Sequence, residues 1–455
     1  MEESNKKFAG SVTITKEIIL DVKKSIHSII DFEKKIKEYI TQNTTNLLDI
    51  ILFGAINLGA SDIHIEPQSD QIRLRIRIDG VLQDAGFFET TIYHNLLSRL
   101  KLLSKLKLNV TNKPQDGRFT IEAENTLIEI RTSSLPAEYG ESIVMRILNP
   151  ENLSLEALGL RKDLYEILSQ EIQKRNGMIV VTGPTSAGKT TSLYALLMKL
   201  QNPGIKIVTI EDPIEYHLKG VSQTQVSPGE SHFNPATGQM VTEKGYDFSD
   251  GLRSIVRQNP DVILVGEIRD LETAKISLQA ALTGHLLLST LHTNDAAGTI
   301  PRLVDLGVDL SSIASALKVS VGQRLLRKVC QKCAVMTTPN PDELAEIKKT
   351  IKSILHLPKE IIIPKDFSEL KIARAQEKGC QECNYTGYKG RKGVCEILLI
   401  DDEMEKFILK NPPVSEIKAL AIKKGMVTIY QSGIIEVIIG ETTLEEVKRV
   451  IEKDE

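Results

Sequence analysis

The segment VVTGPTSAGKTTS, residues 180–192, constrains this chain more than any other part of it. It fits the pattern G-x-x-x-x-G-K-[ST], with Gly183, Gly188, Lys189 and Thr190 at the fixed positions. In such a loop the backbone N–H groups point at phosphate oxygens, the lysine reaches the β- and γ-phosphates, and the threonine holds Mg²⁺. The pattern therefore predicts a loop that binds the phosphates of a nucleotide.

The sequence on both sides of the loop supports this prediction. The apolar run MIVV at 178–181 is suited to a buried strand. The leucines of KTTSLYALLMKL, which follows, have helical spacing, and Pro203 with Gly204 ends the helix. A chance glycine-rich turn would need neither flank, so we favour the phosphate loop. The other residues expected to contact the nucleotide are Pro184, Thr185, Ser186, Ala187 and Thr191.

Length and composition limit the class of protein. The chain has 455 residues, enough for about three domains, and is 41% hydrophobic and 26% charged, as is usual for soluble globular proteins. Its net charge of −3 gives no overall attraction to nucleic acid. We find no apolar run of about 18 residues, and MEESNKKFAG lacks the apolar core of a signal peptide. These features predict a cytoplasmic protein.

Changes of pattern along the chain predict its domains. QIRLRIRIDG alternates apolar residues with arginines, as in a half-buried strand with a solvated outer face, and RFTIEAENTLIEIRTS is typical of a hairpin that turns at Glu124 and Asn125. Strands then alternate with helices, which indicates a parallel α/β sheet. The expected parts are a short helical N-terminal arm (1–45), a small α+β domain (46–150), a linker (151–160), an α/β core (161–325), a four-cysteine region (326–400) and a helical C-terminal region (401–455).

Two acidic residues at strand ends are candidates for catalysis. Glu267 ends the apolar strand at 262–265, where a carboxylate could polarise the attacking water. Gly266 stands where many related folds have an aspartate that supports Mg²⁺. We assign that task to Glu211, which ends the apolar strand of KIVTIEDPIE at the sheet edge where ligands bind.

Two histidines flank one further apolar strand. His285 and His292 stand at the two ends of HLLLSTLH, in a chain with only eight histidines. A lone histidine is usually structural, and that alternative stays open for both. Their shared strand makes them candidates for sensing the γ-phosphate.

The cysteines indicate a metal. Cys330 and Cys333 form one C-x-x-C pair, and Cys380 and Cys383 form another. Two such pairs supply four thiolates for tetrahedral zinc, whereas a redox role would need one pair only. The long spacer must fold back to bring the pairs together. Cys395 is best explained as a buried apolar residue.

These motifs together resemble the secretion ATPases of type II secretion and type IV pilus extension, the GspE/PilB-like group. The resemblance covers about residues 47–455. It depends on the order of ASDIHIEP, RIDGVL, PQDGRF, LPAEYGESIVMRIL, GPTSAGKTT, TIEDPIEY, SIVRQNPDVILVGEIRD, TGHLLLSTLHTNDA and the two C-x-x-C pairs.

The resemblance implies more than the residues alone predict. It implies an ATP hydrolase with a RecA-like P-loop core, a preceding small α+β (PAS-like) domain and a zinc-binding subdomain, with ATP, Mg²⁺ and Zn²⁺ as cofactors. It also implies a homo-hexameric ring at the inner face of the cytoplasmic membrane, attached through an inner-membrane platform protein. In the family, TIEDPIE is an acidic catalytic box and HLLLSTLH a histidine box. Arginines of the small domain reach the nucleotide, and Arg118 and Arg131 match them.

The chain departs from the family in three places. The long N-terminal docking module is represented by at most some 45 residues. The loop has Ser186 where the family usually has glycine, which restricts the backbone. The segment SPGESHFNPATGQMVTEKGYDF, 227–248, is longer than the usual connection and is expected to form a surface excursion.

Three functions are compatible with these motifs. The first is a motor that assembles a pilus or a secretion pseudopilus. The second is a DNA translocase or DNA-uptake motor, against which the net charge of −3 and the lack of an aromatic and basic groove argue, so no direct nucleic-acid contact is expected. The third is a retraction motor, whose relatives lack the four-cysteine region. The cysteines therefore favour extension or secretion.

Overall fold

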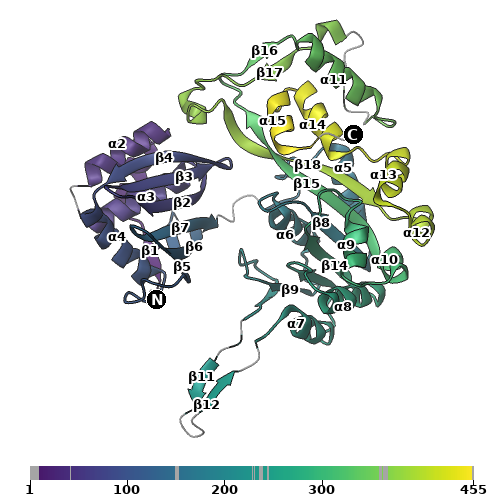
Figure 1. Ribbon diagram of the computed structural model, residues 1–455, viewed down its shortest axis with the longest axis horizontal. Helices are drawn as coiled ribbons and strands as arrows, with labels where there is room; N and C mark the ends of the chain where they lie inside the picture. Colours follow the sequence, from purple (N-terminus) through teal and green to yellow (C-terminus); the bar gives the residue numbers. More distant parts are fainter. Residues whose placement is uncertain are drawn as a thin grey trace. The chain divides into compact units, whose positions relative to one another are not determined.

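The chain forms two units, which are described separately. A computed structural model describes residues 10–452 apart from 41–42, 125, 149–152, 228, 230, 235–238, 243–244, 358–360 and 362–366 (Figure 1). The first unit contains the chain up to 151 together with two cysteine-bearing segments, 330–334 and 375–390. The second unit contains 152–329, 335–374 and 391–455.

The first unit is an α+β domain built on one seven-stranded sheet, of order β1-β5-β6-β7-β2-β3-β4. Alternation decides which face of the sheet is buried: in IRLRIRI the isoleucines and the leucine are buried and the arginines are not. Four helices cover the apolar face and share its core. The elements are β1 (Ser11–Thr13), α1 (Lys16–Ser25), α2 (Ile29–Tyr39), α3 (Thr44–Asn57), β2 (Ala60–Pro67), β3 (Ile72–Ile78), β4 (Val81–Phe88), α4 (Thr90–Leu103), β5 (Gln115–Ala123), β6 (Thr126–Ala137) and β7 (Gly140–Leu148).

The described N-terminal residues, 10–40, are an integral part of this unit and not the separate arm that we expected for 1–45. β1 adds a parallel edge strand to the sheet, with Val12 opposite Ile121. Ile26 and Phe32, from the first two helices, are fully buried in the same core as the strands. A side chain at Gly54 of α3 would lie 2.4 Å from the Phe32 ring, so the glycine is needed for α2 and α3 to pack this closely.

The second unit is a layered α/β domain. Its sheet has the order β10-β9-β13-β14-β8-β15-β18, and the neighbouring strands from β10 to β15 are parallel. Successive residues of the central strand β8 enter different cores, because Met178 and Val180 contact one helix layer and Ile179 and Val181 the other. The strands are β8 (Gly177–Thr182), β9 (Ile207–Glu211), β10 (Ser222–Gln225), β13 (Val262–Val265), β14 (Leu286–Leu291), β15 (Leu317–Val329) and β18 (Tyr388–Leu399).

Helices cover both faces of this sheet, as expected for an α/β core. One layer contains α5 (Lys162–Glu171) and α6 (Lys189–Leu200). The other contains α7 (Phe248–Val256), α8 (Leu271–Leu282), α9 (Thr299–Asp305), α10 (Leu310–Ala316), α12 (Asp402–Ile408) and α13 (Val414–Lys423). Leu155 is buried against the first layer, so the described part of the expected linker, 153–160, belongs to this core.

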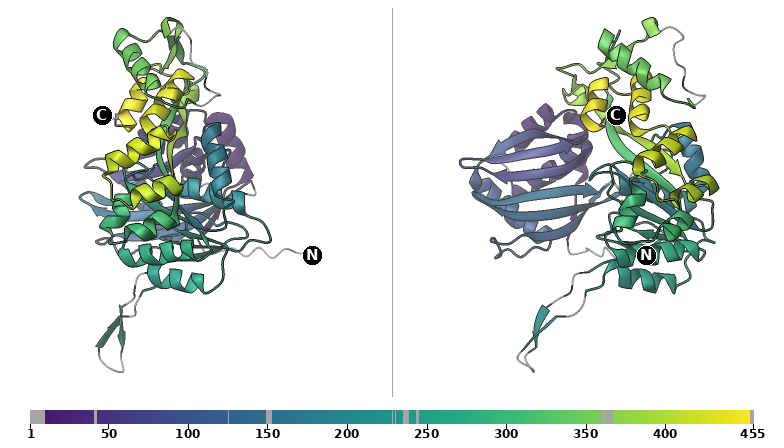
Figure 2. Two further views of the ribbon diagram at one scale, coloured as in Figure 1. Left: turned by 90° about the vertical axis from the view of Figure 1, so that its right-hand side faces the viewer. Right: turned by 45° about the vertical axis from the view of Figure 1, so that its right-hand side comes forward.

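The region between the cysteine pairs and the C-terminal helices form a further cluster in the second unit. It contains α11 (Pro341–Lys352), β16 (Val335–Thr337), β17 (Ile372–Arg374), α14 (Ile429–Ile438) and α15 (Leu444–Val450). The expected excursion after β10 forms an antiparallel ribbon, β11 (Ser231–Asn234) and β12 (Gln239–Thr242), which projects from this unit (Figures 1 and 2). None of the helices in the described part of the chain has the length and apolar character that crossing a bilayer requires.

A buried ion pair makes the first unit sensitive to one substitution. Lys101 Nζ lies 2.6 Å from Glu141 Oε1, with side-chain exposures of 2% and 5%. Lys101→Met would leave the carboxylate buried without its cation, so we expect a loss of about 3–5 kcal/mol in the free energy of unfolding. Lys23→Met is the control, because the Lys23–Glu124 pair is about half exposed and should contribute under about 1 kcal/mol.

The two variants can be compared in the full chain by urea titration, with amide exchange in β6 reporting on this unit. A Lys101→Met unit that unfolds within about 1 kcal/mol of the wild type would show that the pair is not needed for stability.

Candidate functional site

The phosphate loop joins β8 to α6. Gly183 and Gly188 have φ of +153° and +85°, in the region that favours glycine. A side chain at Gly183 would lie 2.5 Å from a carbonyl oxygen of β15, so glycine is also required there for space. Lys189 Nζ donates to the carbonyl oxygens of Gly183 (2.8 Å) and Pro184 (2.9 Å), which holds the loop closed around its own lysine.

Ser186 adopts an unfavourable conformation in this loop. Its φ is +65°, in the left-handed region where a β-carbon is strained. A residue other than glycine costs about 1 kcal/mol or more in this conformation. The backbone conformation at Ser186 thus favours glycine, and the serine adopts it at a cost in conformational energy.

Glu267 lies just beyond the carboxyl end of β13 and has charged neighbours on two sides. Arg269 Nη2 is 2.5 Å from Glu267 Oε1, and His292 Nε2 is 3.6 Å from Glu267 Oε2. Burial lowers the pKa of Lys189; the Glu267 carboxylate opposes this shift, and the charge of Arg324 adds to it. The structure therefore brings Glu267, the loop lysine and His292 into one electrostatic cluster.

The two candidate histidines lie at opposite ends of strand β14. His292 follows β14, and burial lowers its pKa; Lys189 lowers it further and Glu267 opposes the shift. His285 precedes β14, where its Nδ1 is 3.0 Å from the carbonyl oxygen of Ala280. A strand rises about 3.3 Å per residue, so the seven steps from His285 to His292 span roughly 20 Å.

The prediction for His285 is therefore wrong. β14 runs parallel to β8, with Leu286 opposite Gly177 and Leu291 opposite Thr182. The phosphate loop leaves the carboxyl end of β8, which is the edge where His292 lies. His285 lies at the amino edge and has a structural role at the end of α8.

Glu211 ends β9 at the same sheet edge, but its carboxylate is already engaged. Oε2 accepts a hydrogen bond from the hydroxyl of Tyr194, and Oε1 accepts from Thr209 (2.5 Å) and from Gln223 (3.2 Å). The residue is 3% exposed. Glu211 is thus tied to α6 through Tyr194, and three of the roughly four acceptor positions of its carboxylate are in use.

The two candidate arginines of the first unit belong to a longer row of charge. Arg118 of β5 lies directly opposite Arg131 of β6, as the predicted hairpin requires. The row continues across the sheet: Arg146 of β7 lies opposite Arg131, Asp62 of β2 lies opposite Arg146, and Arg77 of β3 lies opposite Asp62. Asp62 lies 3.0 Å from Arg146 and 3.3 Å from Arg77. Side chains directly opposite one another share a face of the sheet, so four guanidiniums and one carboxylate line up on it.

Arg118 also has an acidic neighbour. Its Nη1 lies 3.2 Å from Glu129 Oε1, so Arg118 has an ion pair within its own sheet. Arg73 and Arg75 pair with Asp84 and Glu66, at 2.7 Å and 2.6 Å. The arginines of this face are therefore interleaved with acids, and the row with Asp62 carries four guanidiniums against one carboxylate.

The four cysteines meet, as their spacing predicted. The ligand atoms of Cys330, Cys333, Cys380 and Cys383 all lie within 4.8 Å of one another. The Sγ–Sγ distances between Cys330 and Cys380 and between Cys333 and Cys383 are 3.8 Å and 3.9 Å. Zinc with bonds of about 2.3 Å separates its sulfurs by roughly 3.8 Å in a tetrahedron. The donor set and its dimensions therefore fit zinc, and Cys395 is buried elsewhere.

The second cysteine pair also anchors α2. Asn384, whose φ of +50° ends the turn after Cys383, accepts a hydrogen bond from the backbone N–H of Ile29 at 2.8 Å. Gln381 Nε2 donates to Asp31 at 3.0 Å. These contacts fix the cysteine turn to the first turn of the helix, so the geometry of the cluster and the position of α2 depend on each other.

Two residues of β15 belong to the site and were missed by sequence analysis. Gln323 Nε2 donates to the carbonyl oxygen of Ala187 in the phosphate loop at 2.9 Å. Arg324 Nη2 donates to the carbonyl oxygen of Asn294 at 2.7 Å. A signal was present, because an amide and a guanidinium follow one another in the strand VSVGQRLL, whose other side chains are small or apolar.

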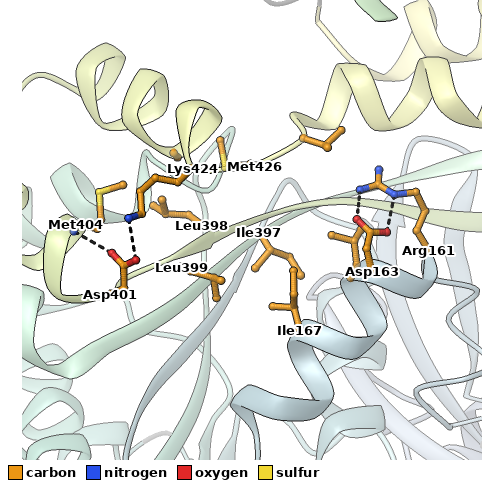
Figure 3. Close-up of a pocket in the computed structure, with 14 residues that line it drawn as sticks. Arg161, Asp163, Ile167, Ile397, Leu398, Leu399, Asp401, Met404, Lys424 and Met426 are labelled. Atoms are coloured by element: carbon orange, nitrogen blue, oxygen red, sulfur yellow. Dashed lines mark hydrogen bonds and ion pairs between the residues drawn. The ribbon is translucent and has the colours of Figure 1, made fainter. Parts of the chain in front are cut away.

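A separate pocket of about 150 Å³ lies between α5 and the end of β18 (Figure 3). Its walls are apolar, and two ion pairs flank it: Arg161 with Asp163 (2.8 Å) and Lys424 with Asp401 (2.9 Å). Its lining residues belong neither to the phosphate loop nor to the strand ends that carry Glu267 and His292. This pocket is therefore not the nucleotide site.

Solved structures similar to this chain include a pilus retraction motor and an ATPase. The pilus retraction motor PilT with bound ADP is 25% identical, with a TM-score of 0.56 over 88% of this chain and 95% of the other. The ATPase DotB of Legionella pneumophila is 20% identical, with a TM-score of 0.61 over 90% and 96%. The second likeness concerns the fold alone, and both agree with a RecA-like core preceded by a small domain.

Sequence comparison identifies the family. The profile of the family described as type II/IV secretion system protein matches residues 38–449. Type II secretion system protein E of Xanthomonas campestris pv. campestris is 38% identical over 89% of this chain and 67% of the relative. The type IV pilus assembly ATPase PilB of Acinetobacter baylyi is 37% identical over 96% and 71%. The chain therefore belongs to the type II/IV secretion system protein family and is an ATP-hydrolysing P-loop enzyme.

Proposed function

We propose that the chain is a hexameric cytoplasmic ATPase that powers assembly of a type IV pilus or a type II secretion pseudopilus. It acts at the inner face of the cytoplasmic membrane, through an inner-membrane platform protein. The observation that carries the proposal is the meeting of Lys189, Glu267 and His292 at one sheet edge, in a chain of this family. The four-cysteine cluster favours extension or secretion over retraction.

The nucleotide would be held by the phosphate loop, residues 183–191. ATP binding would draw Lys189 from the two loop carbonyls to the phosphates, exchanging neutral acceptors for anionic ones. Thr190 and Glu211 would hold Mg²⁺, which supplies charge neutralisation at the β- and γ-phosphates. Zn²⁺ would be held by Cys330, Cys333, Cys380 and Cys383 in a structural role.

Glu267 would act as the general base. Its carboxylate is 15% exposed and ion-paired to Arg269, so it is held in place yet reachable by water. Burial and Lys189 lower the pKa of His292, which favours its neutral form, and a neutral imidazole can hydrogen-bond a phosphate or the water without adding charge. The row containing Arg118 and Arg131 would supply arginine fingers to the nucleotide of a neighbouring subunit.

Glu267→Gln tests the catalytic proposal directly. The amide keeps the shape but cannot accept the proton of water, so we expect ATP binding to persist while phosphate release slows at least about a hundredfold. Lys189→Ala should instead lose nucleotide affinity, because the cation of the loop is removed. Near-normal phosphate release by Glu267→Gln would contradict the assignment.

The same variant tests the machine in cells. In cells without the wild-type gene, Glu267→Gln should leave filament number and protein secretion at the level of the empty vector. Filament counts by electron microscopy would measure this. Arg327→Lys is the control, because this arginine of β15 pairs with Glu446 and lies outside the site. If filaments and secretion persisted but DNA uptake failed, the DNA-motor alternative would replace the proposal.

The zinc site makes a separate prediction. Elemental analysis of protein purified without chelator should find one zinc per chain in the wild type and in Cys395→Ser, and a loss of zinc in Cys383→Ser. Because Asn384 and Gln381 anchor α2, amide exchange at Ile29 should accelerate in Cys383→Ser. Wild-type protein without zinc would refute a zinc site. Loss of ATP binding on chelation would place the metal at the active site instead.

Action of the arginine row between subunits can be tested by mixing variants. Arg131→Ala and Glu267→Gln should each be inactive alone, because one lacks the finger and the other the base. In verified mixed rings some interfaces combine an intact arginine with an intact glutamate, so phosphate release should partly recover. Mixed rings with no recovery would show that Arg131 does not act in trans.

A further inference from the structure

β15 directs two consecutive side chains to two loops, the phosphate loop and the loop that begins with His292. Gln323 is 3% exposed and uses both ends of its amide: Nε2 donates to the carbonyl oxygen of Ala187 (2.9 Å), and Oε1 accepts from Ser192 Oγ (2.8 Å). Ala187 lies in the phosphate loop and Ser192 in the first turn of α6. The amide therefore fixes the phosphate loop to the strand.

Arg324 makes the corresponding contact with the other loop. Its Nη2 donates to the carbonyl oxygen of Asn294 (2.7 Å), and its Nη1 to the carbonyl oxygen of Gln323 (3.0 Å). The guanidinium also lies against the phosphate loop, because a β-carbon on Gly183 would be 3.3 Å from Nη1. Burial lowers the pKa of Arg324, and its charge contributes to the lowered pKa of Lys189. The guanidinium thus binds the second loop at Asn294 and lies beside Gly183 of the phosphate loop, which Gln323 ties to the same strand.

The loop held by Arg324 begins with His292. At its start, the backbone N–H of Thr293 donates to Thr182 Oγ1 at 2.8 Å. At its end, the backbone N–H of Ala296 donates to the buried carboxylate of Glu396 at 2.7 Å, and the other oxygen of that carboxylate accepts from the N–H of Ile429 at 3.0 Å. Arg324 holds the carbonyl between these two points, so it fixes the middle of the loop.

We propose that Arg324 is a positioning residue for ATP hydrolysis, which holds the His292 loop in register with the phosphate loop. The proposal rests on the role given to His292 above. The planar fork of arginine spans two carbonyl oxygens at once, whereas the ammonium of lysine is a point charge on a flexible stem. Losing the fork would release the Asn294 carbonyl, and a shift of about 1 Å at a catalytic group costs about a hundredfold in rate.

Arg324→Lys keeps the charge and removes the fork. We expect the turnover number to fall about ten- to a hundredfold, with the KM for ATP changed less than about threefold, because the phosphate loop keeps Gln323 and Lys189. Arg327→Lys is the matched control: this arginine lies on the same strand, and its Nε and Nη2 donate to Glu446 at 3.0 Å and 2.7 Å. It should lose thermal stability and keep its turnover number.

A double-mutant cycle with His292→Ala separates positioning from general loss of structure. If Arg324 acts through the His292 loop, Arg324→Lys should have little further effect in a His292→Ala background. Amide exchange gives a second readout that needs no activity: Thr293 and Ala296 should exchange faster in Arg324→Lys and not in Arg327→Lys. The turnover number of the wild type tests whether the chain hydrolyses ATP. That of His292→Ala tests the role of the histidine, so a failure of either assignment can be told apart from a failure of the role given to Arg324.

Four results would overturn the proposal. One is a turnover number of Arg324→Lys within threefold of the wild type. Another is that the effects of Arg324→Lys and His292→Ala on the turnover number multiply, as those of independent changes do. A further one is a His292→Ala variant with the turnover number of the wild type. The last is unchanged amide exchange at Thr293 and Ala296 in Arg324→Lys.

Discussion

Parallel pairing of the central strands is the constraint on which the nucleotide site depends. β9, β13, β14 and β8 run in one direction, so the residues that follow them gather at one edge of the sheet. Lys189 and Thr190 begin α6 there, Glu267 follows β13, and His292 follows β14. The same polarity removes His285 from the site. Strand direction thus decides which side chains reach the site, and residue type decides what those side chains can do there.

The charged groups at that edge have partners within the protein, but two of its cations lie close together. Lys189 is held by loop carbonyls and Glu267 by Arg269. Arg324 and Lys189 are near enough for the charge of one to lower the pKa of the other. A polyphosphate would relieve this repulsion and compete for the lysine. Ser186 adds backbone strain within the same loop.

Much of this arrangement could be predicted from sequence, because local patterns decide it. The phosphate loop lies between a strand and a helix, as its flanks predicted, and the four cysteines meet, as their spacing predicted. What could not be predicted depends on pairing between distant segments. β1 joins the sheet through β5, the N-terminal helices enter its core, and Asp62 lies between Arg146 and Arg77 only because β7, β2 and β3 are neighbours. The error on His285 came from treating the two ends of one strand as equivalent.

A structure of the chain with Mg²⁺, ADP and a planar γ-phosphate analogue such as aluminium fluoride would test the central claim most directly. The account predicts Lys189 Nζ within about 3 Å of the β-phosphate or the analogue, and the Glu267 carboxylate within about 3 Å of the water in line with it. A nucleotide bound away from residues 183–191, or a Glu267 carboxylate more than about 6 Å from that water, would contradict it.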